Sequence, residues 1–472
     1  MNEFDYLAKA KEKMKDEKYH EVISLCNKAL KINENLPQAY SFRGNAKYNL
    51  GEYDNAADDF SHAIEKDPNE ADHYYDRSWS YCNMDMFEDA IVDINKALIL
   101  EPEKSLFYYD KGRFEYFAER FKEAVVDLTK GIELKPTERK YIFRGKSYME
   151  LQEYDSALAD FYKALDFESE SYQAYYYIGL VKLLTEQYTD AVENFKKTVE
   201  SCPDYADAWI KLGMAKVELG QKDALKYFSK AIKLEPDYSN YYKLRIVARK
   251  KMLKRQFKLE QLSSGNFIDS NFDEIQILNE KQAKDDIKDI SRVIHLEPED
   301  VCSYKMRADR YEYLRDYIDA ITDYTSLIEL EPDNYINYEQ RAFCEQLMGQ
   351  YENAIKDCDK VLELKKDYRD IMCFVTRAMA NYKLGNYPDA LSDFNRAHSI
   401  NETASICYHR GLTNYKLKNY IDSYSDFKKA SELNPDVELE YKEKIPKFIK
   451  IFLNKRQDNN IPIGLCQIKI KE

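Results

Sequence analysis

A short phrase returns about every 34 residues along most of this chain, and its period constrains the fold more than any other feature. The phrase combines a small residue, a Gly-x-Tyr turn or a close variant, two alanines and a proline. One clear copy contains Gly44, Tyr53, Ala56, Phe60, Ala63 and Pro68. A fixed period of this length indicates a solenoid, in which each unit buries its apolar face only against its neighbours. Such an architecture favours binding over catalysis.

Each copy of the phrase predicts a pair of helices. Its apolar residues fall at helical spacing, and the spacing breaks near the Gly-x-Tyr turn. The small residue of the first helix and the alanines of the second would let the two helices approach closely. The proline would end the second helix.

Numbered within one repeat, the pattern has a small residue at position 8, an aromatic residue at 17, alanine at 20 and 27, and proline at 32. This pattern resembles that of the tetratricopeptide repeat (TPR) family. The resemblance implies an all-α solenoid, a right-handed superhelix of about twelve helix–turn–helix repeats. Four regions follow from the register: an N-terminal array of seven repeats, an interrupted repeat, a C-terminal array of four repeats, and a capping helix with an apolar tail. Their residues are 3–238, 239–300, 301–437 and 438–472.

The interrupted repeat carries an insertion of about 28 residues beyond the repeat length expected for the family. Residues 245–258 are strongly basic and continue the first helix past its normal end. A helix over residues 239–262 would be about 36 Å long at 1.5 Å per residue. The insertion could also be a hinge between the two arrays.

A basic residue at repeat position 7 varies together with an aspartate at position 23. Where position 7 is apolar, as at Ile178 and Leu212, position 23 is not acidic. We therefore predict an ion pair between the two helices of each repeat, in preference to a ladder of arginines that binds anionic ligands. The predicted pairs are Arg43/Asp59, Arg77/Asp93, Lys111/Asp127, Arg144/Asp160, Arg245/Asp289, Arg307/Asp323, Arg341/Asp357, Arg377/Asp393 and Arg410/Asp426.

The resemblance also implies a partner-binding groove, because first helices line the concave face of TPR arrays. Repeats three to seven place an aromatic and apolar run there, of the kind that interface hot spots favour. The predicted groove residues are Tyr75, Trp79, Tyr109, Arg113, Tyr116, Phe117, Ile142, Lys146, Tyr176, Tyr177, Leu180, Leu183, Ile210 and Met214. The alternative is that some of these side chains pack between neighbouring first helices or beneath the chain's own tail.

The basic run offers a second candidate surface, which would dock RNA or an anionic membrane. Its residues are Arg249, Lys250, Lys251, Lys254, Arg255 and Lys258. The simpler interpretation is a solvated helix whose basic face meets the acidic segment 269–280. A third possibility is a homo-oligomer in which residues 461–470 fill another copy's groove.

Composition excludes several other classes. A net charge of −14 disfavours nucleic-acid binding by the chain as a whole. We expect no secretory signal, no transmembrane segment and a cytoplasmic protein with reduced thiols, since the nine cysteines are scattered. Catalytic motifs are missing and the six histidines lie far apart, so we expect no enzyme, no cofactor and no metal. The predicted function is a non-catalytic scaffold or adaptor that binds an extended peptide or partner helix.

Overall fold

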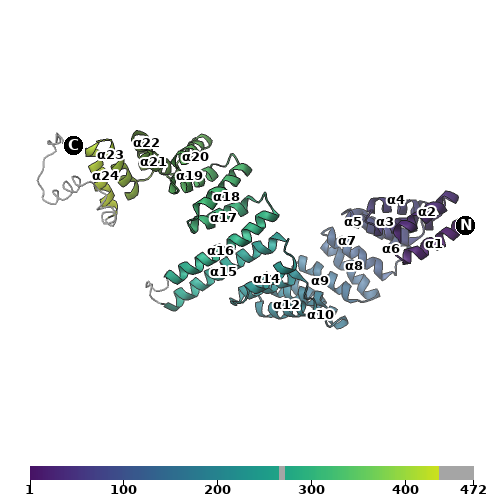
Figure 1. Ribbon diagram of the computed structural model, residues 1–472. Coiled ribbons are helices and arrows are strands. Elements are labelled where there is room, and N and C mark those ends of the chain that lie inside the picture. Colours follow the sequence, from purple (N-terminus) through teal and green to yellow (C-terminus); the bar gives the residue numbers. More distant parts are fainter. Residues whose placement is uncertain (265–271, 435–472) are drawn as a thin grey trace. The chain divides into compact units, whose positions relative to one another are not determined.

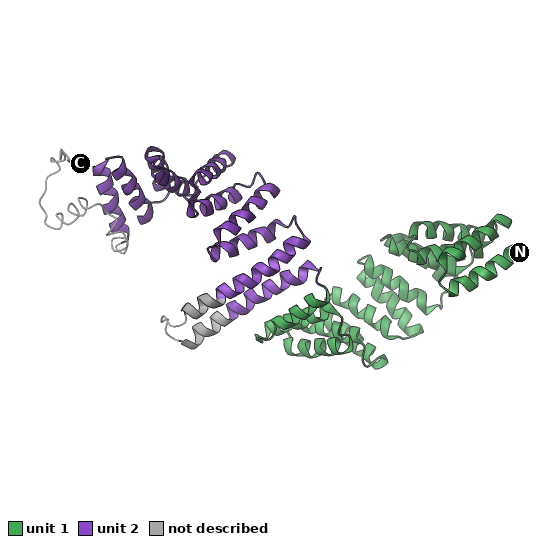
Figure 2. Ribbon diagram, viewed as in Figure 1, with its two compact units in different colours: residues 1–235 green, residues 236–472 purple. Residues whose placement is uncertain are grey.

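The computed structural model describes residues 1–264 and 272–434, and of residues 256–278 it describes no side chain. The described residues form twenty-four helices and no strand, in agreement with the predicted all-α repeat of about twelve helix pairs. The chain divides into two compact units, residues 1–235 and residues 236–472 (Figure 2).

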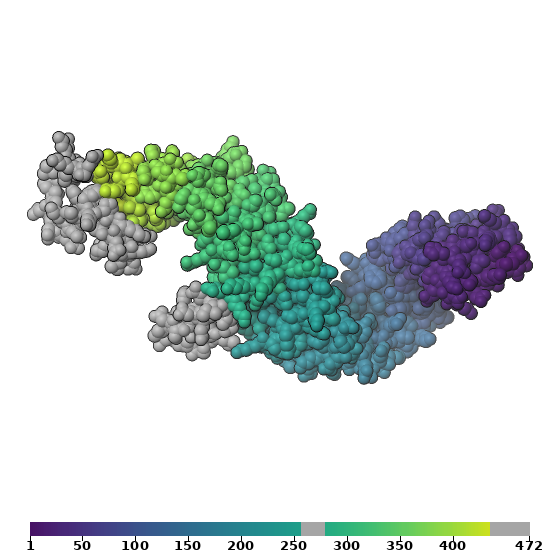
Figure 3. All heavy atoms as spheres, viewed as in Figure 1, coloured from purple at the N-terminus to yellow at the C-terminus, as the bar shows by residue number. Residues whose placement is uncertain are grey.

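Unit 1 is a stack of helix pairs in which the first helix has 13 residues and the second has 14, except for the 10-residue α14. In the space-filling view the surface of unit 1 continues without a break from purple to teal (Figure 3). Their bounds are α1 Glu3–Lys15, α2 Tyr19–Ile32, α3 Pro37–Asn49, α4 Tyr53–Lys66, α5 Ala71–Asn83, α6 Phe87–Leu100, α7 Ser105–Phe117, α8 Phe121–Leu134, α9 Glu138–Glu150, α10 Tyr154–Phe167, α11 Tyr172–Leu184, α12 Tyr188–Ser201, α13 Ala206–Glu218 and α14 Leu225–Leu234.

Unit 2 begins with two long helices, α15 Ser239–Ser264 and α16 Phe272–Leu296, which lie side by side (Figure 1). They have 26 and 25 residues, so the insertion lengthens both helices of one pair. The predicted capping helix lies outside the described residues. The remaining helices are α17 Val301–Tyr313, α18 Tyr317–Leu330, α19 Tyr335–Leu347, α20 Tyr351–Leu364, α21 Met372–Leu384, α22 Tyr387–Ile400, α23 Ala404–Lys416 and α24 Tyr420–Leu433.

The small residue at position 8 is required because a large side chain of the second helix lies against it. A Cβ added to Gly145 would lie 2.5 Å from Cε1 of Phe161, and one added to Gly112 would lie 2.5 Å from Cγ of Leu128. Real Cβ atoms do not approach that closely, so these pairs of helices could not pack as they do with a larger residue. The glycine thus fixes the distance between the two helices of its repeat.

In eleven helix pairs whose turns are described, the turn between the two helices places one residue in the left-handed region. Glycine occupies it in four pairs, at Gly51, Gly220, Gly349 and Gly385. A glycine is the least costly residue at positive φ, which explains the Gly-x-Tyr phrase. In seven other pairs a side-chain-bearing residue adopts the same conformation: Glu17, Asp85, Glu119, Gln152, Glu186, Arg315 and Lys418.

All nine predicted ion pairs are formed. The Arg245/Asp289 pair spans 44 positions instead of 16, with the predicted insertion between its two partners. The arginine guanidinium also reaches the second helix of the preceding pair. Arg77 Nη1 donates to Ser61 Oγ at 2.9 Å, and Arg341 Nη1 donates to Thr325 Oγ1 at 3.1 Å. Each such arginine therefore joins three helices.

Candidate partner-binding face

The first helices of unit 1 form a face of their own, which we call the first-helix face (α3, α5, α7, α9, α11 and α13). Neighbouring first helices contact each other, as α7 does with α9 and α9 with α11. Side chains about one repeat apart bridge them. Tyr75 OH, for example, donates to Asp110 Oδ2 at 2.8 Å, and Tyr116 OH donates to Glu150 Oε1 at 3.3 Å. The face is therefore a continuous surface along the stack.

Two cations lie among the aromatic rings of this face. The guanidinium carbon of Arg113 lies 4.6 Å from the ring centroid of Trp79 and 5.2 Å from that of Phe143. Lys146 Nζ lies 4.5 Å from the centroid of Phe143 and 5.6 Å from that of Tyr177. Burial lowers the pKa of Lys146. Cation–π contacts of this kind hold the rings in fixed positions across α5, α7, α9 and α11, so that the surface is ordered in the free chain.

A pocket of about 250 Å³ opens between α3 and α5 on this face. It is lined by Asn45, Tyr48, Asp76 and Trp79. Asn45 Nδ2 donates to Asp76 Oδ2 at 2.9 Å. The pocket therefore presents a carboxylate between an aromatic phenol and an indole, a set that suits a cationic side chain.

Asp76 has no ion-pair partner anywhere in the described ranges, and Asn45 is the side chain that hydrogen-bonds to it. Burial raises the pKa of Asp76 to about 6, and the hydrogen bond from Asn45 opposes this rise. Asp110 occupies the same repeat position one repeat later, but it accepts hydrogen bonds from Tyr75 and from Arg113 at 2.8 and 3.0 Å. A cation bound in the pocket would give Asp76 the partner that Asp110 already has.

The predicted groove residues divide by exposure. Phe117 is 40% exposed. Ten more are partly exposed on first helices of unit 1, namely Tyr75, Trp79, Tyr109, Arg113, Tyr116, Lys146, Tyr177, Leu180, Leu183 and Met214. Ile142, Tyr176 and Ile210 are 3%, 6% and 0% exposed, so for these three the prediction of a ligand-facing position is wrong. They are enclosed by neighbouring helices, as the alternative interpretation expected, and the phenol of Tyr176 is hydrogen-bonded to Asp207.

Three pocket residues, Asn45, Tyr48 and Asp76, are not among the predicted groove residues. The signal that could have found them is the repeat register, because Asn45 and Tyr48 hold positions 9 and 12 and Asp76 holds position 6. The predicted groove began at the third repeat and left out the second.

The basic run of α15 is partly internal. Arg249 Nη1 donates to Asp286 Oδ1 at 2.7 Å and its other terminal nitrogen donates to Asp289, so the prediction that Arg249 is a docking residue is wrong. Lys250, Lys251, Lys254 and Arg255 are exposed. The side chain of Lys258 lies outside the described residues.

Lys250 and Lys254 line a pocket of about 330 Å³ between α15, α16 and α17. Arg310, Tyr313 and Asn279 also line it. Arg310 Nε donates to Asp286 Oδ2 at 3.3 Å, whereas neither lysine has an ion-pair partner in the described part of the chain. Among the described residues, the pocket therefore has two lysine charges without an ion-pair partner.

The eight cysteines within the described residues are free thiols. No helix there combines the length and the apolar character that crossing a bilayer requires. Residues 461–470 lie outside the described residues, so the homo-oligomer hypothesis stays a prediction.

Three family models described as tetratricopeptide repeat match the sequence, over residues 37–70, 144–206, 206–238, 337–368 and 404–437. No curated protein matches it.

Several solved structures are similar to the chain. The C-terminal part of a TPR repeat-containing protein from Cytophaga hutchinsonii is 20% identical, with a TM-score of 0.43, and the match covers 50% of this chain and 98% of that one. YrrB, described as a TPR protein with an unusual peptide-binding site, is 23% identical with a TM-score of 0.34, covering 41% of this chain and 99% of that one. Yeast Tom70 is 17% identical with a TM-score of 0.32, covering 97% of each chain.

Proposed function

From the premise that this chain is a tetratricopeptide repeat protein, we propose that its first-helix face in unit 1 binds an extended segment of a partner protein. Proteins of this family are generally interaction scaffolds and typically non-catalytic. The observation that carries the proposal is the pocket at Asp76, where a carboxylate without an ion-pair partner in the described residues lies beside Trp79 and Tyr48. We propose that this pocket takes a lysine or arginine side chain of the bound segment.

The rest of the face supports the same function. Tyr109, Tyr116 and Tyr177 continue the surface from α7 to α11, and their rings are held by Arg113 and Lys146. Aromatic anchors with little freedom to lose are favourable for binding, because less conformational entropy is lost on association. An extended segment that fills the Asp76 pocket with its basic residue would lay its other side chains along these rings.

A selection from a phage-displayed library of random peptides, carried out on the full chain, tests the proposal. We expect enriched peptides to share one basic position flanked by apolar residues. Calorimetry of one such peptide should show at least tenfold weaker binding to Asp76→Asn and to Trp79→Ala. Asp72→Asn is the matched control, since Asp72 lies on the same helix with a 60% exposed side chain and pairs with Lys104 instead.

Two results would count against the proposal. The first is that the selection enriches no peptide. The second is that enriched peptides bind the Asp76→Asn and Trp79→Ala variants as tightly as they bind wild type. Circular dichroism of each variant separates loss of binding from loss of fold.

As a second candidate function, we propose that an RNA or an anionic membrane docks at the pocket of Lys250 and Lys254, because these lysines have no ion-pair partner among the described residues. Binding there should weaken steeply as salt rises, whereas binding to the aromatic face should change little. Lys250→Glu/Lys254→Glu should abolish it and leave peptide binding intact. Salt-independent binding, or binding that survives this double substitution, would rule the second candidate out.

A further inference from the structure

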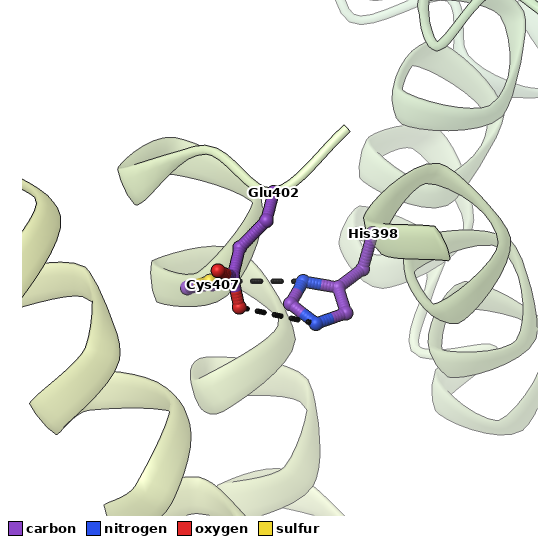
Figure 4. Close-up of side chains that lie close together, drawn as sticks. All are labelled: His398, Glu402 and Cys407. Atoms are coloured by element: carbon purple, nitrogen blue, oxygen red, sulfur yellow. Dashed lines mark hydrogen bonds and ion pairs between the residues drawn. The ribbon is translucent and has the colours of Figure 1, made fainter. Parts of the chain in front are cut away.

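Three side chains of different chemistry come together between α22 and α23 in unit 2. His398 lies near the end of α22, Glu402 lies in the connection, and Cys407 lies in the first turn of α23. In Figure 4 the two ring nitrogens of His398 point toward the other two side chains. Nδ1 lies 3.8 Å from Cys407 Sγ, and Nε2 lies 3.5 Å from Glu402 Oε1. One ligand atom from each residue lies within 4.8 Å of the others.

This junction lacks two features that recur in other repeats. In four other repeats a tyrosine at position 4 donates its hydroxyl to the backbone carbonyl of the residue six positions earlier, as Tyr338 does to Pro332 at 3.1 Å and Tyr175 does to Ser169 at 3.0 Å. Cys407 occupies position 4 of its repeat, where that hydrogen bond cannot form. Glu402 occupies position 32 of the preceding repeat, where most of the other repeats have proline, Pro332 among them. Two elements of the ordinary junction are thus replaced by metal-ligating residue types.

We propose that His398, Glu402 and Cys407 form a binding site for a zinc ion. Thiolate, imidazole and carboxylate are the three ligand types that zinc takes in proteins, and a site with three protein ligands keeps a fourth position for water. Metal–ligand bonds of about 2.0–2.1 Å to nitrogen and 2.3 Å to sulfur bring the two donor atoms to about 3.5 Å in tetrahedral geometry. The 3.8 Å separation of Nδ1 and Sγ already approaches this value.

The site can fill from solvent. The side chains of His398 and Glu402 are 24% and 40% exposed, while Cys407 is buried. Glu402 lies on the Nε2 side of the His398 ring. Rotation about its side-chain bonds would bring a carboxylate oxygen to the ion held by Nδ1 and Cys407 Sγ. On binding, the thiol of Cys407 releases its proton to solvent and the sulfur coordinates as thiolate.

Lys429 completes the surroundings of the site. Its Nζ lies 3.2 Å from Glu402 Oε2, so it can hold the carboxylate oxygen that does not bind the ion. Bound zinc would then link the C-terminal end of α22 to α23 and α24, and would stabilise the last described helix pair.

Cobalt(II) is the probe for the test, because a cobalt–thiolate bond has an intense charge-transfer absorption. The metal-free full chain is titrated with cobalt chloride under reducing conditions and then with zinc chloride. In wild type, we expect the thiolate charge-transfer band to saturate at one equivalent of cobalt and to disappear when zinc displaces it. The band should be absent in Cys407→Ser and should need at least tenfold more cobalt in His398→Ala. Cys302→Ser removes an exposed thiol on α17 and should leave the band unchanged.

Thermal unfolding provides a second readout that does not depend on cobalt. Zinc should raise the Tm of wild type and of Cys302→Ser, but not that of His398→Ala or Cys407→Ser. The proposal is overturned if wild type gives no thiolate band, or if the band survives Cys407→Ser and is lost in Cys302→Ser. Circular dichroism at low temperature verifies that each variant is folded before titration.

Discussion

Arg77 and Asp93 are joined by two parallel hydrogen bonds, from Nε to Oδ2 at 2.7 Å and from Nη2 to Oδ1 at 2.8 Å. The third nitrogen of the same guanidinium donates to Ser61 of the preceding helix pair. The side chain of Asp93 is 5% exposed, so its charge is separated from water. One arginine thus connects α5 to both α6 and α4, and its equivalents repeat this arrangement along both units.

Arg77→Ala should lower the free energy of unfolding by about 3 kcal/mol, because it leaves the carboxylate of Asp93 buried without a cation. Urea denaturation of the full chain measures the change as a shift of the midpoint. Arg139→Ala is the control, since Arg139 is exposed. Equal midpoints for the two variants would show that the ion pair contributes nothing to stability.

Gly145→Ala should destabilise the chain by about 1–3 kcal/mol, because the new Cβ would lie 2.5 Å from Cε1 of Phe161 and the two helices would have to separate. Gly131→Ala is the matched control. Its Cβ would find no atom nearer than 3.4 Å, so the higher helix propensity of alanine should leave stability equal or better. Thermal melts of both variants check the prediction, which fails if Gly145→Ala melts no lower than Gly131→Ala.

Glu345→Gln should stabilise the protein at pH 8 by roughly 1–3 kcal/mol and have little effect at pH 4.5. Burial, followed by the neighbouring Asp357, raises the pKa of Glu345 from 4.5 to about 7. A carboxyl whose folded pKa is raised favours the folded state while it is protonated. The contribution of protonated Glu345 to the free energy of unfolding is present below pH 4.5 and is lost as the pH rises from 4.5 to about 7.

Urea midpoints at pH 4.5 and pH 8 measure the effect of Glu345→Gln. Glu352→Gln changes an exposed glutamate on the next helix, α20, and should show no difference between the two pH values. A gain for Glu345→Gln of the same size at both pH values would contradict the proposed cause, because it could not come from ionisation.

Binding of the selected basic peptide should weaken as the pH falls below about 6, by up to tenfold per pH unit, because protonation removes the charge of Asp76. Calorimetry from pH 5 to pH 8 measures this dependence. Asp76→Asn should bind weakly at every pH. Asp72→Asn should keep the pH dependence but move it toward lower pH, because the charge of Asp72 helps to raise the pKa of Asp76. A profile for wild type that is flat over this range would exclude Asp76 as the recognition group.

The sequence by itself determined the helix pairs and their register. The 16-residue spacing of Arg77/Asp93 recurs in eight of the nine ion pairs, and the ninth, Arg245/Asp289, located the insertion. Such features depend on contacts inside one repeat, so a periodic pattern is sufficient to predict them. The position of Gly145 against Phe161 follows from the same local geometry.

Only the tertiary structure decided which side chains of the first-helix face stay accessible. Asp76 and Asp110 share a repeat position, yet Tyr75 and Arg113 hold Asp110 while Asp76 keeps a hydrogen bond from Asn45. Ile142 is buried for a similar reason, because neighbouring helices close over it. The cluster of His398, Glu402 and Cys407 depends on how one repeat ends and the next begins. Exposure and charge pairing are set by side chains from several helices at once, and a repeat pattern describes each helix pair separately.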